Sequence, residues 1–186
     1  MDAFAKQIAF LEQHSNYARR WLSAKPEWRS WLQSMGSQEI TLAGIQGLLQ
    51  SCMVYGLEVE QDEAKFMTDL RLARQKLMLW LAFRDLNGLA DLKEVTHSLS
   101  HFAELAVNCA LTFIRQDLQV RFGVPWSDST SFEMPMMVVG MGKLGGLELN
   151  LSSDIDLIFL YEHEDETRDG PKSLSNHEWF TRMGKR

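Results

Sequence analysis

The chain has 186 residues, a hydrophobic content of 45% and a formal net charge of −6. This length can bury a sizeable core, and the acidic balance argues against a nucleic-acid surface, which needs clustered positive charge. No window approaches the ~18 continuous apolar residues of a membrane span, and Asp2 and Lys6 interrupt what would be the apolar core of a signal peptide. Cys52 and Cys109 have no Cys-x-x-Cys spacing and imply neither a disulfide framework nor a zinc site. We expect a cytoplasmic protein that binds neither nucleic acid nor a membrane.

Residues 1–122 predict an array of helices. Apolar residues spaced by three and four predict a helix over residues 3–14, and Pro26, a favoured first-turn residue, precedes another over residues 27–32. Thr41 can cap a helix over residues 42–55.

The two longest predicted helices follow. Asp62 can cap a helix that reaches Asn87, where Gly88 is placed to end it. A further helical run extends from about residue 92 to residue 122, where Gly123 and Pro125 stop it. Residues 123–135, rich in Ser, Asp and Pro, are predicted to be a linker.

The segment that indicates chemistry is Met136–Tyr161, MMVVGMGKLGGLELNLSSDIDLIFLY. An apolar run leads into a glycine-rich stretch, then into two serines and an Asp-x-Asp pair, and a second apolar run follows. This order predicts a strand, a turn that can approach a phosphate, and another strand. The residues concerned are Gly140, Gly142, Gly145, Gly146, Ser152, Ser153, Asp154 and Asp156.

The Asp-x-Asp pair predicts a divalent-metal site. Successive side chains of a strand point to opposite faces, so Asp154 and Asp156 are expected on one face. Two close carboxylates repel each other, and a hard cation such as Mg2+ relieves that repulsion. Lys143 adds positive charge at the turn, and the hydroxyls of Ser152 and Ser153 could donate to phosphate oxygens or cap the turn. A hairpin with a glycine loop and two surface aspartates is the simpler alternative.

The run from Gly140 to Gly145 also matches the Gly-x-Gly-x-x-Gly dinucleotide fingerprint. That fold needs a full helix after the glycines and an acidic residue about 20 positions on. Here Asp154 comes too soon, and no long helix fits before it. A dinucleotide-binding oxidoreductase fragment of the Rossmann type therefore stays a secondary hypothesis, as does a non-catalytic protein-binding module.

The strand, glycine turn and Asp-x-Asp resemble the nucleotidyltransferase superfamily of the polymerase beta type. The fuller string GMGKLGGLELNLSSDIDLIFLY resembles the family of bifunctional glutamine synthetase adenylyltransferases and adenylyl-removing enzymes. LRLARQKLMLWLAFRDLNGLADL (residues 70–92) resembles the helical stretch that this family carries ahead of its first catalytic domain, and SNHEWFTRMGKR (residues 175–186) resembles the start of the helix that follows the motif. One position departs, since Leu147 stands where a charged residue is expected, which bears on surface contacts near the turn.

The resemblance implies an α+β protein, with a mainly α-helical N-terminal array followed by the first strands of a nucleotidyltransferase domain over residues 136–186. It also implies the activity: moving AMP on and off a tyrosine of glutamine synthetase, with this part matching the deadenylylating, phosphorolytic half. Asp154 and Asp156 would hold Mg2+, and Gly140, Gly142, Lys143 and the two serines would bind the nucleotide. Implied partners are glutamine synthetase, the P-II signalling protein, ATP or ADP, and phosphate.

In this superfamily a third carboxylate completes the metal site from a later strand. The candidates in this chain are Glu162, Glu164, Asp165 and Glu166, but such a dense run of one charge, ending in Asp-Gly-Pro, favours a solvated loop. The family's enzymes are far longer, so we expect a truncated piece. Because the chain offers no convincing third carboxylate, we expect little or no activity from it alone.

Other residue sets favour ordinary structural roles. Tryptophans at helical spacing are typical of a core, and His97 and His101, four apart, lack a third zinc ligand. Arginines on the long predicted helix could reach a nucleotide, but they more often face solvent or form ion pairs. These tryptophans and arginines are Trp21, Trp28, Trp31, Trp80, Arg71, Arg74 and Arg84.

Overall fold

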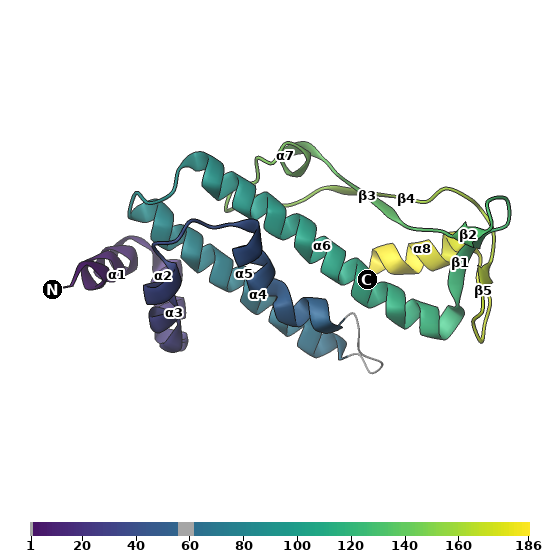
Figure 1. Cartoon of the computed structure of the whole chain (residues 1–186), viewed down its shortest axis with the longest axis horizontal. Coiled ribbons are helices and arrows are strands. Elements are labelled where there is room, and N and C mark those ends of the chain that lie inside the picture. Colours follow the sequence, from purple (N-terminus) through teal and green to yellow (C-terminus); the bar gives the residue numbers. More distant parts are fainter. Residues whose placement is uncertain (1, 56–61) are drawn as a thin grey trace.

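The computed structural model describes residues 2–55 and 62–186, and most of this chain is helical. In Figure 1 the longest helix, α6, runs through the middle of the molecule, with α4 and α5 on one side and the strands β3 and β4 on the other. None of the described helices is both long and apolar enough to cross a membrane. The helices are α1 (Ala3–His14), α2 (Asn16–Ala24), α3 (Glu27–Met35), α4 (Leu42–Tyr55), α5 (Glu63–Leu86), α6 (Leu92–Phe122), α7 (Gly142–Gly145) and α8 (Asn176–Lys185).

The helix boundaries follow from local capping. The Asp62 carboxylate accepts a hydrogen bond from the Lys65 amide at 3.0 Å and so begins α5. Asp91 does the same for α6, accepting from the Glu94 amide at 2.7 Å. Gly123 ends α6 with a φ of 79°, which glycine adopts without strain. The helices predicted over residues 3–14, 42–55 and 92–122 are confirmed at both ends.

Two helices differ from the sequence prediction. The helix that begins at Glu27 continues to Met35, one turn beyond the predicted end. Helix α2 was not predicted; Ser15 caps it by accepting a hydrogen bond from the Ala18 amide at 3.1 Å. Because Ser15 ends α1 and begins α2, the two helices follow each other with no loop between them.

The helical part has two cores that share α5. One joins α5 to α4 and α6 around Leu77 and Trp80, and the other joins α5 to α1, α2 and α3 around Leu79 and Phe83. The predicted role of the tryptophans in the core is confirmed: Trp28 and Trp80 are buried and the other two are partly buried. Trp21 stacks on Trp28 with ring centroids 5.5 Å apart, and Trp31 meets Trp80 edge to face at 5.7 Å.

The predicted linker contains strands. β1 (Val124–Ser127) pairs antiparallel with β2 (Phe132–Glu133) and with β5 (Thr167–Arg168), which lies inside the run predicted as a loop. Helix α8 packs against this sheet and the C-terminal half of α6. Its core contains Leu118, Met134, Leu174, Trp179, Phe180 and Met183.

Candidate functional site

The apolar runs on either side of the glycines form an antiparallel hairpin. β3 (Met137–Gly140) pairs with β4 (Leu157–Leu160) in a register that places Gly140 opposite Leu157. One more hydrogen bond continues the ladder, from the Met141 amide to the Asp156 carbonyl at 2.9 Å. A dinucleotide-binding unit needs parallel strands joined by a full helix. The antiparallel pairing and the four-residue α7 do not fit that unit.

The glycine turn is closed by α7 and depends on the absence of side chains. Gly142 has a φ of 53°, a left-handed conformation that favours glycine. A Cβ at Gly145 would lie 2.6 Å from the carbonyl oxygen of Gly140, so the chain folds back closely on the end of β3. Lys143 is exposed at the same turn. Leu147, the position that departs from the family pattern, has a positive φ of 57° without being glycine.

A second turn, Asn150–Ser153, leads to the acidic pair. The Asn150 side-chain oxygen accepts hydrogen bonds from the hydroxyls of Ser152 and Ser153 at 3.1 and 2.9 Å. It also accepts from the Ser152 amide at 3.1 Å. Of the two roles open to these hydroxyls, the described structure shows the capping role. The Ser153 oxygen also accepts from the Asn150 amide at 3.1 Å, so both hydroxyls direct their protons into the turn and help to close it.

Asp154 and Asp156 lie directly before β4, not within it. The sequence predicted both acids on a strand, whereas the paired residues of β4 begin at Leu157, because the regular pairing ends where the chain enters the glycine turn. Both aspartates are exposed, and neither carboxylate hydrogen-bonds to or forms an ion pair with any residue in the described ranges. Exposed carboxylates without protein partners have oxygen lone pairs available for a cation.

The segment that carries Asp154 covers a cavity of about 440 Å³ between α5 and α6. Leu149 anchors the segment: its side chain is buried and its amide donates to the Ser100 hydroxyl at 3.3 Å. Arg71 and Arg74 of α5 also line the cavity. The sequence analysis left two roles open for these arginines, contact with a nucleotide or exposure to solvent. Their spacing of three, which places both on one side of the helix, was the sequence feature that could have indicated the first role.

The acidic run after β4 is partly ordered by its own contacts. The Asp165 carboxylate accepts from the Asp128 amide at 3.0 Å, and the Asp165 carbonyl accepts from the Asn176 amide at 2.7 Å. The Glu164 carboxylate accepts from the Tyr161 hydroxyl, and this bond raises the pKa of Tyr161 to about 12. Within residues 2–55 and 62–186, no group of three His, Cys, Asp or Glu side chains is arranged to hold a metal ion.

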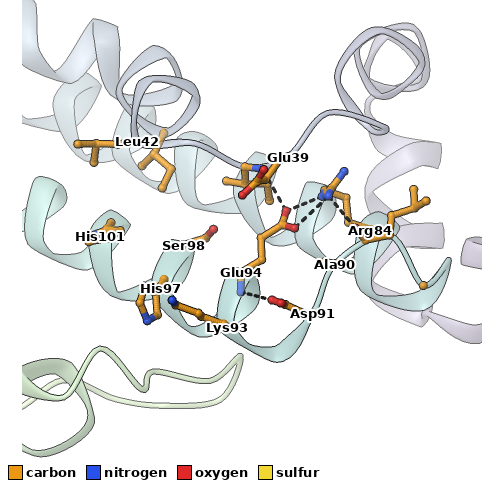
Figure 2. Close-up of a pocket in the computed structure, with 14 residues that line it drawn as sticks. Glu39, Leu42, Arg84, Ala90, Asp91, Lys93, Glu94, His97, Ser98 and His101 are labelled. Atoms are coloured by element: carbon orange, nitrogen blue, oxygen red, sulfur yellow. Dashed lines mark hydrogen bonds and ion pairs between the residues drawn. The ribbon is translucent and has the colours of Figure 1, made fainter.

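A separate cavity of about 770 Å³ lies where α5 ends and α6 begins (Figure 2). Arg84 and Glu94 line this cavity and form an ion pair, and their side chains are only 5% and 10% exposed. Arg84 therefore has the ion-pair role considered from the sequence. Figure 2 shows His97 and His101 on α6 at the side of this cavity. The His101 Nδ1 atom lies 3.2 Å from Glu104 Oε2, and within the described chain these side chains form no group of three that could hold a metal ion.

The two cysteines, Cys52 and Cys109, are buried free thiols. Burial raises the pKa of Cys52 to about 11 and also raises that of Cys109. Both belong to the core around Trp80 and act as small apolar side chains.

The family model described as glutamate-ammonia ligase adenylyltransferase matches residues 6–186, nearly the whole chain. The chain belongs to this family. Three relatives, each called "bifunctional glutamine synthetase adenylyltransferase/adenylyl-removing enzyme", show the extent of the likeness. That of Ralstonia nicotianae is 40% identical over 179 residues, covering 96% of this chain and 18% of the relative.

The relatives from Nitrosomonas eutropha and Bordetella pertussis are 36% and 40% identical over 184 and 187 residues. Each match covers 98% of this chain and 19% of the relative. The chain thus spans about a fifth of the length of the curated relatives that it matches. The family resemblance drawn from the glycine and Asp-x-Asp segment is confirmed by these matches.

Proposed function

We propose that this chain supplies part of an enzyme that adds AMP to a tyrosine of glutamine synthetase and removes it, and that its part serves removal. The observation that carries the proposal is the pair Asp154 and Asp156, exposed and without partners among the described residues, next to the glycine turn of a chain that belongs to the adenylyltransferase family. The helical array ahead of the motif supports the deadenylylating half. A polymerase-beta-like domain beginning near residue 136 is part of the same proposal.

The removal reaction is a phosphorolysis. An oxygen of inorganic phosphate attacks the adenylyl phosphorus, a new P–O bond forms, and the bond from phosphorus to the tyrosine oxygen breaks. ADP leaves, and the tyrosine oxygen takes up a proton. Such a transfer needs positioning and charge stabilisation more than covalent help from the protein.

The residues present fit a Mg2+ site in the chemistry of their donors. Asp154 and Asp156 offer hard carboxylate oxygens that no described side chain occupies. When bound there, Mg2+ would stabilise negative charge on the phosphoryl group. The chain's own contribution is to hold these oxygens at the end of the ladder, fixed by the bond from Met141 to the Asp156 carbonyl.

The glycine turn is the proposed phosphate-positioning element. The backbone at Gly142 can approach the ligand because nothing lies within 4 Å of the place where a Cβ would stand, whereas the absent Cβ of Gly140 makes room for Leu144 and keeps the turn compact. Lys143 contributes an exposed cation. Ser152 and Ser153 shape the turn ahead of the acids through Asn150, and rotation of a hydroxyl away from Asn150 would let it donate to a phosphate oxygen. Glutamine synthetase as protein substrate, the P-II signalling protein as regulatory partner, and ATP, ADP and phosphate as small ligands complete the proposal.

The test is calorimetric titration of ADP into the 186-residue chain with and without Mg2+. We expect Mg2+-dependent binding that Asp154→Asn with Asp156→Asn abolishes. Asp85→Asn with Asp169→Asn removes the same charge from two other exposed positions and should leave the titration unchanged. Identical ADP titrations for the acid-pair variant and the unmodified chain would refute the metal-site proposal and favour a non-catalytic binding module.

A further inference from the structure

The cavity beneath the Asp154 segment has a strongly apolar interior. Its wall on α6 is made largely of small or flat side chains, which leaves a slot instead of a filled interface. The segment before β4 covers one side of this slot. The apolar lining residues are Leu70, Leu77, Leu99, Phe102, Ala103, Ala106, Val107, Ala110, Leu149, Leu151 and Ile155.

The polar groups at this cavity are few and carry charge. Arg71 and Arg74 lie three residues apart on α5, so both project from the same side of the helix. Both side chains are exposed, and no hydrogen bond or ion pair joins either guanidinium to another residue of the described chain. Asp154 lines the same cavity, and no ion pair joins it to either arginine, so the opposite charges border the cavity without neutralising each other.

Two unpaired guanidinium groups beside an apolar slot select a particular ligand chemistry. Guanidinium donors match phosphate oxygens in a bidentate geometry that lysine cannot reproduce. A slot of about 440 Å³ lies within the range of small-molecule sites, and its lining suits a flat ring. The chain carries a net charge of −6, so it has no general attraction for anions, and phosphate binding requires a local arrangement such as this pair.

We infer that Arg71 and Arg74 bind the phosphate of a purine nucleotide whose base enters the apolar slot between α5 and α6. The inference deepens the proposed function and rests on it. It makes the helical array part of the nucleotide site: α5 supplies the phosphate-binding cations, and the segment Asn150–Asp154 supplies the carboxylate side. The contact from the Leu149 amide to Ser100 holds the two halves together.

The phosphate half of the inference is tested by titrating AMP, inorganic phosphate and adenosine into the 186-residue chain in Mg2+. For Arg71→Gln with Arg74→Gln we expect about a tenfold or greater rise in the Kd of AMP, because charge-assisted hydrogen bonds are lost. Adenosine, which has no phosphate, should bind both proteins equally. Arg71→Lys with Arg74→Lys keeps the charge and should give an intermediate loss. Lys6→Gln with Lys172→Gln, at two other exposed cations, is the charge-matched control.

Inorganic phosphate separates the two possible sources of the anion. If it binds with the same dependence on the arginines and displaces AMP, then a free phosphate uses the same subsite. If only AMP depends on the arginines, the ligand is the nucleotide. Unchanged AMP and phosphate titrations in the glutamine pair, with a normal circular dichroism spectrum, would overturn the inference.

The base half has its own variant. Ala103→Phe fills the slot from α6 and should weaken AMP and adenosine alike while inorganic phosphate still binds. Undiminished AMP binding in this variant would show that the base lies elsewhere. The acid-pair variant distinguishes failure of this inference from failure of the proposed function. If Asp154→Asn with Asp156→Asn weakens nucleotide binding but the arginine double variant does not, this inference is refuted and the metal site stands. The reverse result refutes the metal site alone.

Discussion

The ion pair between Arg84 and Glu94 is expected to be the most sensitive polar contact of the helical array. Glu94 accepts from Arg84 Nε at 2.5 Å, from Arg84 Nη2 at 2.9 Å and from the Ile40 amide at 3.0 Å. Arg84 also donates to the carbonyls of Gly36 and Leu89 at 3.3 and 2.8 Å. One guanidinium thus joins the end of α5, the start of α6 and the chain between α3 and α4.

Replacing Glu94 with alanine leaves a buried cation without its anion. Breaking a buried pair by removing one partner costs about 3–5 kcal/mol. In a chain of this size each kcal/mol lowers Tm by about 2–4 °C, so the expected fall is about 6–20 °C. The double variant Arg84→Met with Glu94→Leu removes both charges and should lose much less than the sum of the single changes.

The assay is urea unfolding and thermal unfolding followed by circular dichroism, arranged as a double-mutant cycle. Arg121→Gln is the control, because its ion pair with Asp117 leaves the Arg121 side chain 58% exposed; such a surface pair contributes about 0–1 kcal/mol. A loss below about 1 kcal/mol for Glu94→Ala would contradict the reasoning, because it would mean that the charge left behind finds water or another partner.

Three further outcomes are expected. Gly145→Ala places a Cβ 2.6 Å from the Gly140 carbonyl oxygen and should lower the free energy of unfolding by about 1–3 kcal/mol. Gly47→Ala places a Cβ with no other atom within 4 Å and should raise the free energy of unfolding by about 0.5–1 kcal/mol. Equal shifts of the urea midpoint in the two variants would contradict this. Burial raises the pKa of Cys52 from 9.0 to about 11, so the thiol's contribution to stability is complete below pH 9 and is lost as pH rises toward 11. Urea unfolding at several pH values should show that Cys52→Val loses less free energy of unfolding between pH 9 and 11 than the unmodified chain. An equal loss would refute the assignment. Fluorine NMR of fluorotryptophan-labelled chain should give one urea midpoint for Trp80 and Trp179, and two separate midpoints would show independent units.

The helices could be predicted because their signals are local. Asp62 and Asp91 lie next to the amides that they cap, and Gly123 ends α6 by its own backbone conformation. The glycine turn was predictable for the same reason. Helix α2 was missed because its cap, Ser15, also ends α1, so the change of helix axis leaves no gap in the helical pattern.

The strands in the predicted linker could not be read from local sequence. β1 pairs Val124 with Arg168, more than 40 positions away, and is stabilised by a partner that the linker's own composition does not reveal. The placement of Arg71 and Arg74 beside the candidate site likewise depends on contacts between residues far apart in the sequence. Nothing near Arg71 in the sequence indicates that the Asp154 segment lies across the groove from it; only the packing of α5 against α6, with Leu149 anchored at Ser100, brings them to one cavity.

Helix α6 explains why the candidate site and the helical array depend on each other. Its N-terminal half contributes Val95 and Phe102 to the core with α4 and α5, while Leu118, near its C-terminal end, packs with Trp179 of α8. The same helix lines the slot beneath Asp154 with side chains from Leu99 to Ala110. A substitution that shifts α6 in the helical core therefore moves one wall of the slot relative to the glycine turn. For this reason a change in nucleotide affinity must be compared with unfolding data before it is attributed to a direct contact. The comparison is clearest at Arg71 and Arg74, because both side chains are exposed and belong to neither core.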